Sequence, residues 1–134
     1  MKVVLDTKKI QIIDIFQKMT GATVLDCIDE DDEISLVVAE GQYGLAVGRS
    51  GSSIKNAEKV FKKSIRVFEY SADMKQFINN MLGDIDEMEV RDNFVYVRVR
   101  HSNRARAIGR NGRNIKMVNR FITRLFDIGG IKVR

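Results

Sequence analysis

The sequence of 134 residues predicts an α+β fold in which a unit of order α-β-β-α-α-β occurs twice. In both halves, some segments have apolar residues every three or four positions, as in helices, and others alternate apolar and polar residues, as in strands. A motif is also repeated, because residues 46–55 read AVGRSGSSIK and residues 107–116 read AIGRNGRNIK. Since the motif stands at the same place in each series of elements, we interpret the chain as two copies of one unit.

The first half begins with a predicted helix over residues 7–19. Thr7 is predicted to be its N-cap, and Gly21 to end it, because glycine readily takes the left-handed conformation found after helices. The acidic run at residues 29–33 is interpreted as a solvated turn between two strands. The other predicted elements are strands over residues 23–29 and 34–39, a short segment leading to Val47, a helix over residues 52–62 and a strand over residues 64–70.

The second half follows the same order. Ser71 is predicted to cap its first helix, Ser102 to cap a short helix, and Gly129-Gly130 to turn the chain into the last strand. The predicted elements are a helix over residues 73–82, strands over residues 85–90 and 94–100, a short helix ending at Ile108, a helix over residues 113–126 that buries Ile115 and Phe126, and a strand over residues 131–133.

The two copies divide the chain into a first domain at residues 1–70 and a second domain at residues 71–134. No stretch rich in Pro, Gly or Ser separates them, so we expect the domains to pack rigidly instead of moving on a tether. A unit of this size is near the lower limit for folding alone, which also favours a shared interface.

Positive charge follows the two motifs. The chain has a net charge of +5 and a pI of about 9.5, which points weakly to an acidic partner. Residues 1–40 hold four basic and nine acidic residues, whereas residues 98–134 hold eleven basic residues and one acid, Asp127. This segregation is expected of a protein that turns one side toward phosphates.

The sequence lacks the features of exported and membrane proteins. Its single cysteine, Cys27, cannot form an internal disulfide, which fits a reducing cytoplasm. No apolar run approaches the roughly 18 residues of a membrane span, and the N-terminus lacks a signal peptide. We therefore expect a cytoplasmic protein without a membrane partner. We also expect a monomer.

Catalytic and metal chemistry are not indicated either. His101 is the only histidine, so no zinc-type ligand set exists, and the acidic run at residues 29–33 lacks the calcium-loop pattern. The glycine loops lack the Gly-Lys-Ser/Thr ending of a phosphate-hydrolysing P-loop. We expect no enzyme activity, no catalytic residues, no metal and no cofactor.

The Gly-x-x-Gly loops are suited to holding a nucleic-acid backbone. Two glycines without Cβ atoms let a sugar-phosphate run close to the loop, and the following helix begins with amides that attract anions. Arg49 and Arg110 each add a guanidinium fork for a phosphate. Apolar residues beside the loops are expected to form floors for bases, with a neighbouring strand reading the base edges: Val47 and Ile54 in the first copy, Ile108 and Ile115 in the second.

Single-stranded RNA suits such a groove, because a duplex hides its base edges. The candidate RNA-binding residues are Gly48, Arg49, Ser50, Gly51, Ile54 and Lys55 in the first copy, and Gly109, Arg110, Asn111, Gly112, Arg113, Ile115 and Lys116 in the second.

The repeated loop in this order of elements resembles the KH domain in its type II topology, over essentially the whole chain. The tandem arrangement is similar to the paired KH domains of the NusA family of transcription factors, and in particular to its short archaeal form. The resemblance implies RNA binding across both domains and a role in transcription termination or antitermination. Bacterial members also carry a polymerase-binding domain and an S1 domain, for which this chain has no room.

Other interpretations remain open. A Gly-x-x-Gly loop can be a plain turn between packed helices, and an arginine run can be a solvated surface, although two matched copies and the shortage of nearby acids favour RNA. The main alternative is a scaffold that docks on RNA polymerase or the ribosome with weak or no sequence-specific RNA binding. RNA polymerase is thus a second candidate partner.

Overall fold

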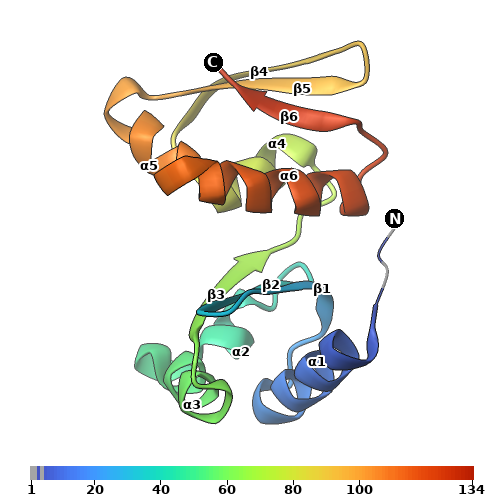
Figure 1. Cartoon of the computed structure of the whole chain (residues 1–134), viewed down its shortest axis with the longest axis vertical. Helices are drawn as coiled ribbons and strands as arrows, with labels where there is room; N and C mark the ends of the chain where they lie inside the picture. Colours follow the sequence, from blue (N-terminus) through green and yellow to red (C-terminus); the bar gives the residue numbers. More distant parts are fainter. Residues whose placement is uncertain (1–2, 4) are drawn as a thin grey trace. The chain divides into compact units, whose positions relative to one another are not determined.

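The computed structural model describes Val3 and residues 5–134, and these form two compact units (Figure 1). The N-terminal unit ends at Ser71 and the C-terminal unit begins at Ala72. Each unit has one three-stranded sheet, with strand order β1-β2-β3 in the first and β4-β5-β6 in the second. None of the described helices is long and apolar enough to cross a membrane.

In the N-terminal unit, α1 and α3 pack on one side of the sheet. The strand β2 pairs antiparallel with β1 and parallel with β3. Apolar side chains of α1, such as Ile12 and Phe16, are buried together with Leu36 and Val38 of β2. The elements are α1 (Thr7–Thr20), β1 (Val24–Asp29), β2 (Glu33–Val38), α2 (Tyr43–Val47), a 3-10 turn (Arg49–Gly51), α3 (Ser52–Phe61) and β3 (Ser64–Glu69).

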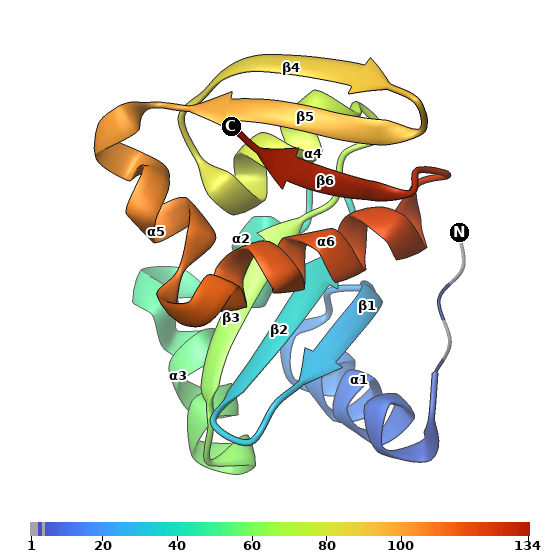
Figure 2. The same ribbon diagram turned by 45° about the horizontal axis from the view of Figure 1, so that its top comes forward.

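The C-terminal unit has the same order and sheet topology. Figure 2 shows β4 running opposite to β5 and β6, and Figure 1 shows α4 and α6 on one face of the sheet. Val95, Val97 and Val99 of β5 are buried. The elements are α4 (Met74–Leu82), β4 (Ile85–Arg91), β5 (Phe94–Val99), a 3-10 turn (His101–Asn103), α5 (Arg104–Ile108), a 3-10 turn (Arg110–Gly112), α6 (Arg113–Leu125) and β6 (Gly130–Val133).

Gly21 ends α1 in the left-handed conformation (φ 79°), as predicted, but the predicted N-caps are wrong. The cap of α1 is Asp6, whose carboxylate accepts from the Lys9 amide at 2.8 Å, while Thr7 is already helical. Likewise Asp73, not Ser71, caps α4. In each case an extended backbone places the aspartate at the cap, and its carboxylate accepts a hydrogen bond from an amide of the first turn.

The predicted cap at Ser102 is wrong as well. The chain enters α5 through a 3-10 turn, and Asn103 precedes the helix without capping it. The side chain of Asn103 is buried and donates to the Leu82 carbonyl at 3.1 Å, so it joins the end of α4 to this turn. The helix predicted to reach Phe126 ends at Leu125, and both Phe126 and Ile115 are only partly buried.

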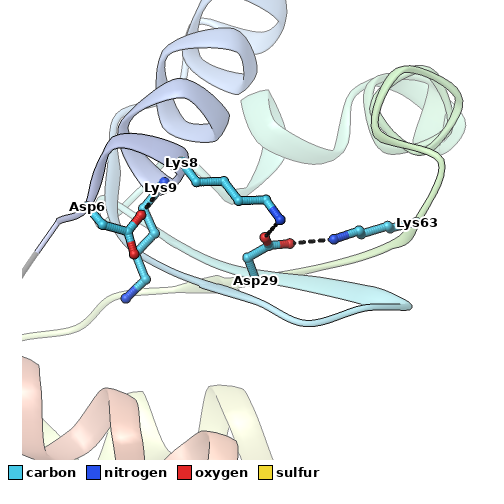
Figure 3. A network of polar contacts seen from close by, with 5 residues as sticks. All are labelled: Asp6, Lys8, Lys9, Asp29 and Lys63. Carbon is cyan, nitrogen blue, oxygen red and sulfur yellow. Dashed lines mark hydrogen bonds and ion pairs between the residues drawn. The ribbon is translucent and has the colours of Figure 1, made fainter.

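The acidic run at residues 29–33, predicted to be a solvated turn, is not wholly solvated, because Asp29 at the end of β1 has a mostly buried side chain. Asp29 lies between two lysines, with Lys63 Nζ at 2.8 Å and Lys8 Nζ at 2.9 Å (Figure 3). Its side chain is only 10% exposed. Burial acts to raise the pKa of Asp29, but the hydrogen bonds and charges of Lys63 and Lys8 outweigh it and lower that pKa. This carboxylate therefore joins α1 to the chain between α3 and β3.

Candidate nucleic-acid interface

The two Gly-x-x-Gly loops have the same backbone conformation. Gly48 (φ 77°, ψ 171°) matches Gly109 (φ 78°, ψ 167°). The third residue of each loop is left-handed, with φ 52° and ψ 30° at Ser50 and φ 55° and ψ 27° at Asn111. The repeated motif thus forms one local structure in both units, although the side chains differ at this position.

The first glycine of each loop is required for packing. A Cβ on Gly48 would contact Ser53 Oγ and lie 2.8 Å from the Ser53 nitrogen. A Cβ on Gly109 would lie 2.8 Å from both the nitrogen and the Cβ of Asn114. The first turn of the following helix therefore approaches the loop too closely for any side chain. The packing of the helix–loop–helix turn by itself therefore requires glycine at these two positions, whether or not a phosphate approaches.

The second glycine of each loop faces open space. A Cβ on Gly51 would meet nothing within 4 Å, and a Cβ on Gly112 would meet only Lys116 Cε at 3.8 Å and Ile115 Cγ2 at 3.9 Å. Both glycines have a left-handed backbone, with φ 75° and 72°. Glycine is favoured at these two positions by the backbone conformation, not by close packing. The space beside each glycine is accessible to a ligand.

The N-termini of the two helices that follow the loops are suited to attracting an anion. Gly51 precedes α3 and Gly112 precedes α6, and neither helix has a side-chain cap or an acidic residue in its first turn. First-turn amides without a side-chain acceptor, together with the helix dipole, favour a negative group at this end.

Cations surround both loops. Arg49 and Lys55 in the N-terminal unit, and Arg110 and Lys116 in the C-terminal unit, are exposed. None of these four forms an ion pair with any described residue. Arg113, which begins α6, is exposed as well. The charges of the first four residues are therefore available to an external anion.

A groove of about 570 Å³ lies between α6 and β6 in the C-terminal unit. It includes two predicted site residues, Ile115 and Lys116, which lie in the first turn of α6 after the Gly109–Gly112 loop. The other predicted residues of this copy lie on the loop itself and at the start of α6. The complete lining is Phe94, Ile115, Lys116, Asn119, Arg120, Gly129, Gly130, Ile131 and Lys132.

Close packing on the strand side shapes the groove. A Cβ on Gly130 would lie 3.1 Å from both Phe94 Cε1 and Asn119 Oδ1, so the ring and the amide occupy the space of a side chain. Asn119 Oδ1 also accepts from the Ile131 amide at 2.9 Å, which holds α6 to the start of β6. Sequence reasoning predicted Gly129-Gly130 as a turn only and missed Phe94, Asn119, Arg120 and Lys132. Asn119 and Arg120 lie one helical turn after Ile115 and Lys116, so helical spacing was a signal that could have found them.

The N-terminal unit has an acid where the C-terminal groove has an aromatic ring. In the parallel pairing of β5 with β6, Phe94 lies opposite Gly130. In the equivalent pairing of β2 with β3, Glu33 lies opposite Ser64. Glu33 Oε1 is 3.6 Å from Arg66 Nη1, so part of the basic charge of β3 is neutralised there.

A second acid replaces an amide in the same region. Glu58 Oε2 accepts from the Ile65 amide at 3.0 Å, in the position where Asn119 accepts from Ile131. The two side chains thus hold helix to strand in the same manner, but one brings a negative charge. Ile54, predicted as a floor for bases, is partly buried and packs against the core of its own unit.

Comparison with known proteins identifies the chain's relatives. A family model described as "KH domain" matches residues 10–75. The "Probable transcription termination protein NusA" of Methanococcus vannielii is 41% identical, over 99% of this chain and 80% of that protein. The chain belongs to the NusA family. Proteins of the same name from Methanocaldococcus jannaschii and from Halobacterium salinarum strain R1 are each 31% identical, with 98% and 92% of this chain and 75% and 92% of theirs covered.

The fold of this NusA-family chain also has a solved counterpart. The structure described as "Crystal structure of APE1850" matches with a TM-score of 0.80 and 28% identity, over 97% of this chain and 100% of that one. The KH match includes the Gly48–Gly51 loop and ends before the Gly109–Gly112 loop. The second unit has the same order of elements and the same loop conformation as the unit that the KH family model matches.

Proposed function

We propose that this chain is a single-stranded RNA-binding protein that acts in transcription termination or antitermination, without enzymatic activity. In this proposal both halves are type II KH domains, residues 1–70 and residues 71–134. The proposal is supported by the KH match over residues 10–75 and by the names of the relatives. The second unit adds the same order of elements and the same loop conformation.

The main support for this proposal is the groove beside the second loop. A phosphate placed beside Gly112 would meet the first amides of α6, whose first turn holds no acidic residue. It would also meet the guanidinium of Arg110, which forms no ion pair with the residues that the structure describes. A base next to it would lie on Ile115 in the groove, with Lys116 and Arg120 at its edge. A KH domain usually clamps about four nucleotides in such a groove.

The two loops are proposed to contribute unequally. Phe94 offers a partly exposed ring to a base in the C-terminal groove. In the N-terminal unit, Glu33 stands in the place of Phe94 and Glu58 in the place of Asn119, and both carboxylates repel phosphates. We expect the C-terminal unit to supply most of the affinity and the N-terminal loop to add a backbone contact.

The experiment compares two double variants of the full chain. Arg110→Asp with Asn111→Asp and Arg49→Asp with Ser50→Asp each place acids on one loop. Aspartate tolerates the left-handed backbone of the third loop position, so both variants should fold. Affinity for a single-stranded RNA pool would be measured by fluorescence anisotropy at several salt concentrations, with circular dichroism as the folding control.

The second-loop variant should bind RNA about tenfold more weakly or worse, and its affinity should depend less on salt. The first-loop variant should lose less. If both folded variants keep wild-type affinity, the loops do not hold RNA. The alternative of a scaffold that docks on RNA polymerase or the ribosome would then account better for the chain.

A further inference from the structure

The sheet of the C-terminal unit has an aromatic and cationic surface on the side away from its helices. Along β5, Val95, Val97 and Val99 are buried, whereas the residues between them are partly or fully exposed. We use the term Tyr96 face for the surface formed by Arg91, Phe94, Tyr96, Lys132 and Arg134. Figure 1 shows α4 and α6 on the opposite face of this sheet.

Three cations surround the ring of Tyr96. Arg91 Cζ lies 4.8 Å from the ring centroid, Arg134 Cζ lies 5.0 Å from it, and Lys132 Nζ lies 5.9 Å from it. Arg91 comes from β4, Lys132 from β6, and Arg134 follows β6, so all three strands contribute to one cluster. The ring is partly buried, and the three cations are exposed.

The Tyr96 face is continuous with the groove beside α6. Phe94 and Lys132 line that groove, and Lys132 Nζ also lies 5.1 Å from the Phe94 centroid. In the register of the sheet, the pair Phe94–Gly130 is followed on the same face by the pair Tyr96–Lys132. A strand of RNA that leaves the groove across Phe94 therefore reaches Tyr96 next.

We propose that the Tyr96 face is a second contact surface for the same single-stranded RNA, where a nucleotide leaving the groove stacks its base on Tyr96. The proposal rests on the RNA-binding function proposed above. An exposed contact between a cation and a ring is weaker than the stacking of a base on that ring, so a base can displace one guanidinium. The displaced arginine and its neighbours then face the phosphates of the same nucleotide.

Two acids on β4 oppose this binding. The proposal therefore predicts variants that bind RNA more strongly as well as variants that bind it more weakly. Glu89 Oε2 is 3.4 Å from Arg134 Nη2, and Glu87 Oε2 is 3.8 Å from Arg98 Nη1. All four side chains are at least 40% exposed, so these surface pairs contribute little to stability. Removing the charge of Glu89 should release Arg134 for RNA and strengthen binding. If the pair had only a structural role, RNA affinity would not change.

The test measures the affinity of the full chain for two single-stranded oligonucleotides by anisotropy. One has about four nucleotides and fills only the groove, and the other has about ten and extends beyond it. The variants are Tyr96→Ala, Tyr96→Phe, Arg91→Gln and Glu89→Gln. Lys18→Gln on α1 is the control, because Lys18 is an exposed lysine paired with Asp14 on its own helix.

Tyr96→Ala should weaken binding of the long oligonucleotide about tenfold and leave the short one unchanged, since stacking on one ring is lost. Arg91→Gln should weaken long-oligonucleotide binding less, Tyr96→Phe should retain it, and Glu89→Gln should strengthen it. Unchanged affinity for the long oligonucleotide in both Arg91→Gln and folded Tyr96→Ala would overturn the proposal. If the wild type binds neither oligonucleotide, the RNA-binding function itself fails, which is a distinct result.

Discussion

A Cβ atom on Gly109 would lie 2.8 Å from the backbone nitrogen of Asn114, the second residue of α6. Asn114 in turn donates its side-chain amide to the Ala107 carbonyl at 2.8 Å. The loop, the helix before it and the helix after it are thus held together around one glycine. In the N-terminal unit Ser53 approaches Gly48 as closely, since a Cβ on Gly48 would lie 2.8 Å from the Ser53 nitrogen.

The two glycines of each loop should respond differently to substitution. Gly109→Ala should destabilise the chain by about 2–4 kcal/mol, because it adds a backbone clash to a left-handed φ. Gly112→Ala has free space and should cost only about 1–2 kcal/mol for its φ. Urea unfolding of the two variants would measure the difference, and equal costs would contradict the packing role assigned to Gly109.

A substitution at the third position of the first loop should make the folded chain more stable. Ser50 has a left-handed backbone that suits asparagine better, and Asn111 stands at the same position of the second loop. Ser50→Asn should stabilise the chain by up to about 1 kcal/mol, and Asn111→Ser should destabilise it by a similar amount. Thermal unfolding would detect both changes, and a shared sign for the two would refute this account of the loops.

The carboxylate of Glu58 should limit RNA binding by the N-terminal unit. Glu58→Gln keeps an oxygen that can accept from the Ile65 amide, so it removes the charge with little change in packing. RNA affinity should rise a few-fold, or by up to about 1 kcal/mol, as expected when a like charge near a phosphate is removed. Asp14→Asn on α1 removes an equal charge from an exposed helix position and serves as the control. An equal rise in both variants would indicate a general effect of net charge.

Asp29 should contribute stability that depends on pH. Its pKa in the folded chain is lowered below the ordinary 3.8, so the carboxylate stabilises the fold above that value. This stability is lost as the pH falls through the lowered pKa and Asp29 takes up a proton. Asp29→Asn should therefore cost about 1–3 kcal/mol at pH 7 and much less near pH 2.

Urea unfolding of wild type and Asp29→Asn at the two pH values would measure this difference. Lys63 is the better buried partner, with a side chain 19% exposed against 69% for Lys8. Lys63→Gln should thus destabilise the chain more than Lys8→Gln. A cost for Asp29→Asn that is the same at both pH values would exclude the ion pairs as its cause.

Much of the fold could be predicted from local pattern. The alternation of Val95, Val97 and Val99 with Tyr96 and Arg98 predicted a strand over residues 94–100 with the valines on one face. The structure has this strand at Phe94–Val99, with the three valines buried. The N-caps could not be chosen, because Asp6 stands beside Thr7 and both are residues that cap helices. Backbone conformation, which the sequence does not specify, decides between such neighbours.

Only one side of the groove in the C-terminal unit could be predicted from the sequence. Its helix side follows from the motif, which contains Ile115 and Lys116, but its strand side depends on the register that brings Phe94 opposite Gly130. The same register reveals that Glu33 takes the place of the ring in the N-terminal unit. Pairing between distant segments carries this information, and periodicity within one segment does not. The rigid packing of the two halves stays a prediction.

The most direct measurement is a map of backbone amide shifts in the ¹⁵N-labelled chain titrated with a short single-stranded RNA. We expect the largest changes in the Gly109–Lys116 segment and in β6 at Gly130, Ile131 and Lys132, with smaller changes around Gly48 and Gly51. Saturable binding that leaves the Gly109–Lys116 amides and β6 unshifted would contradict this expectation.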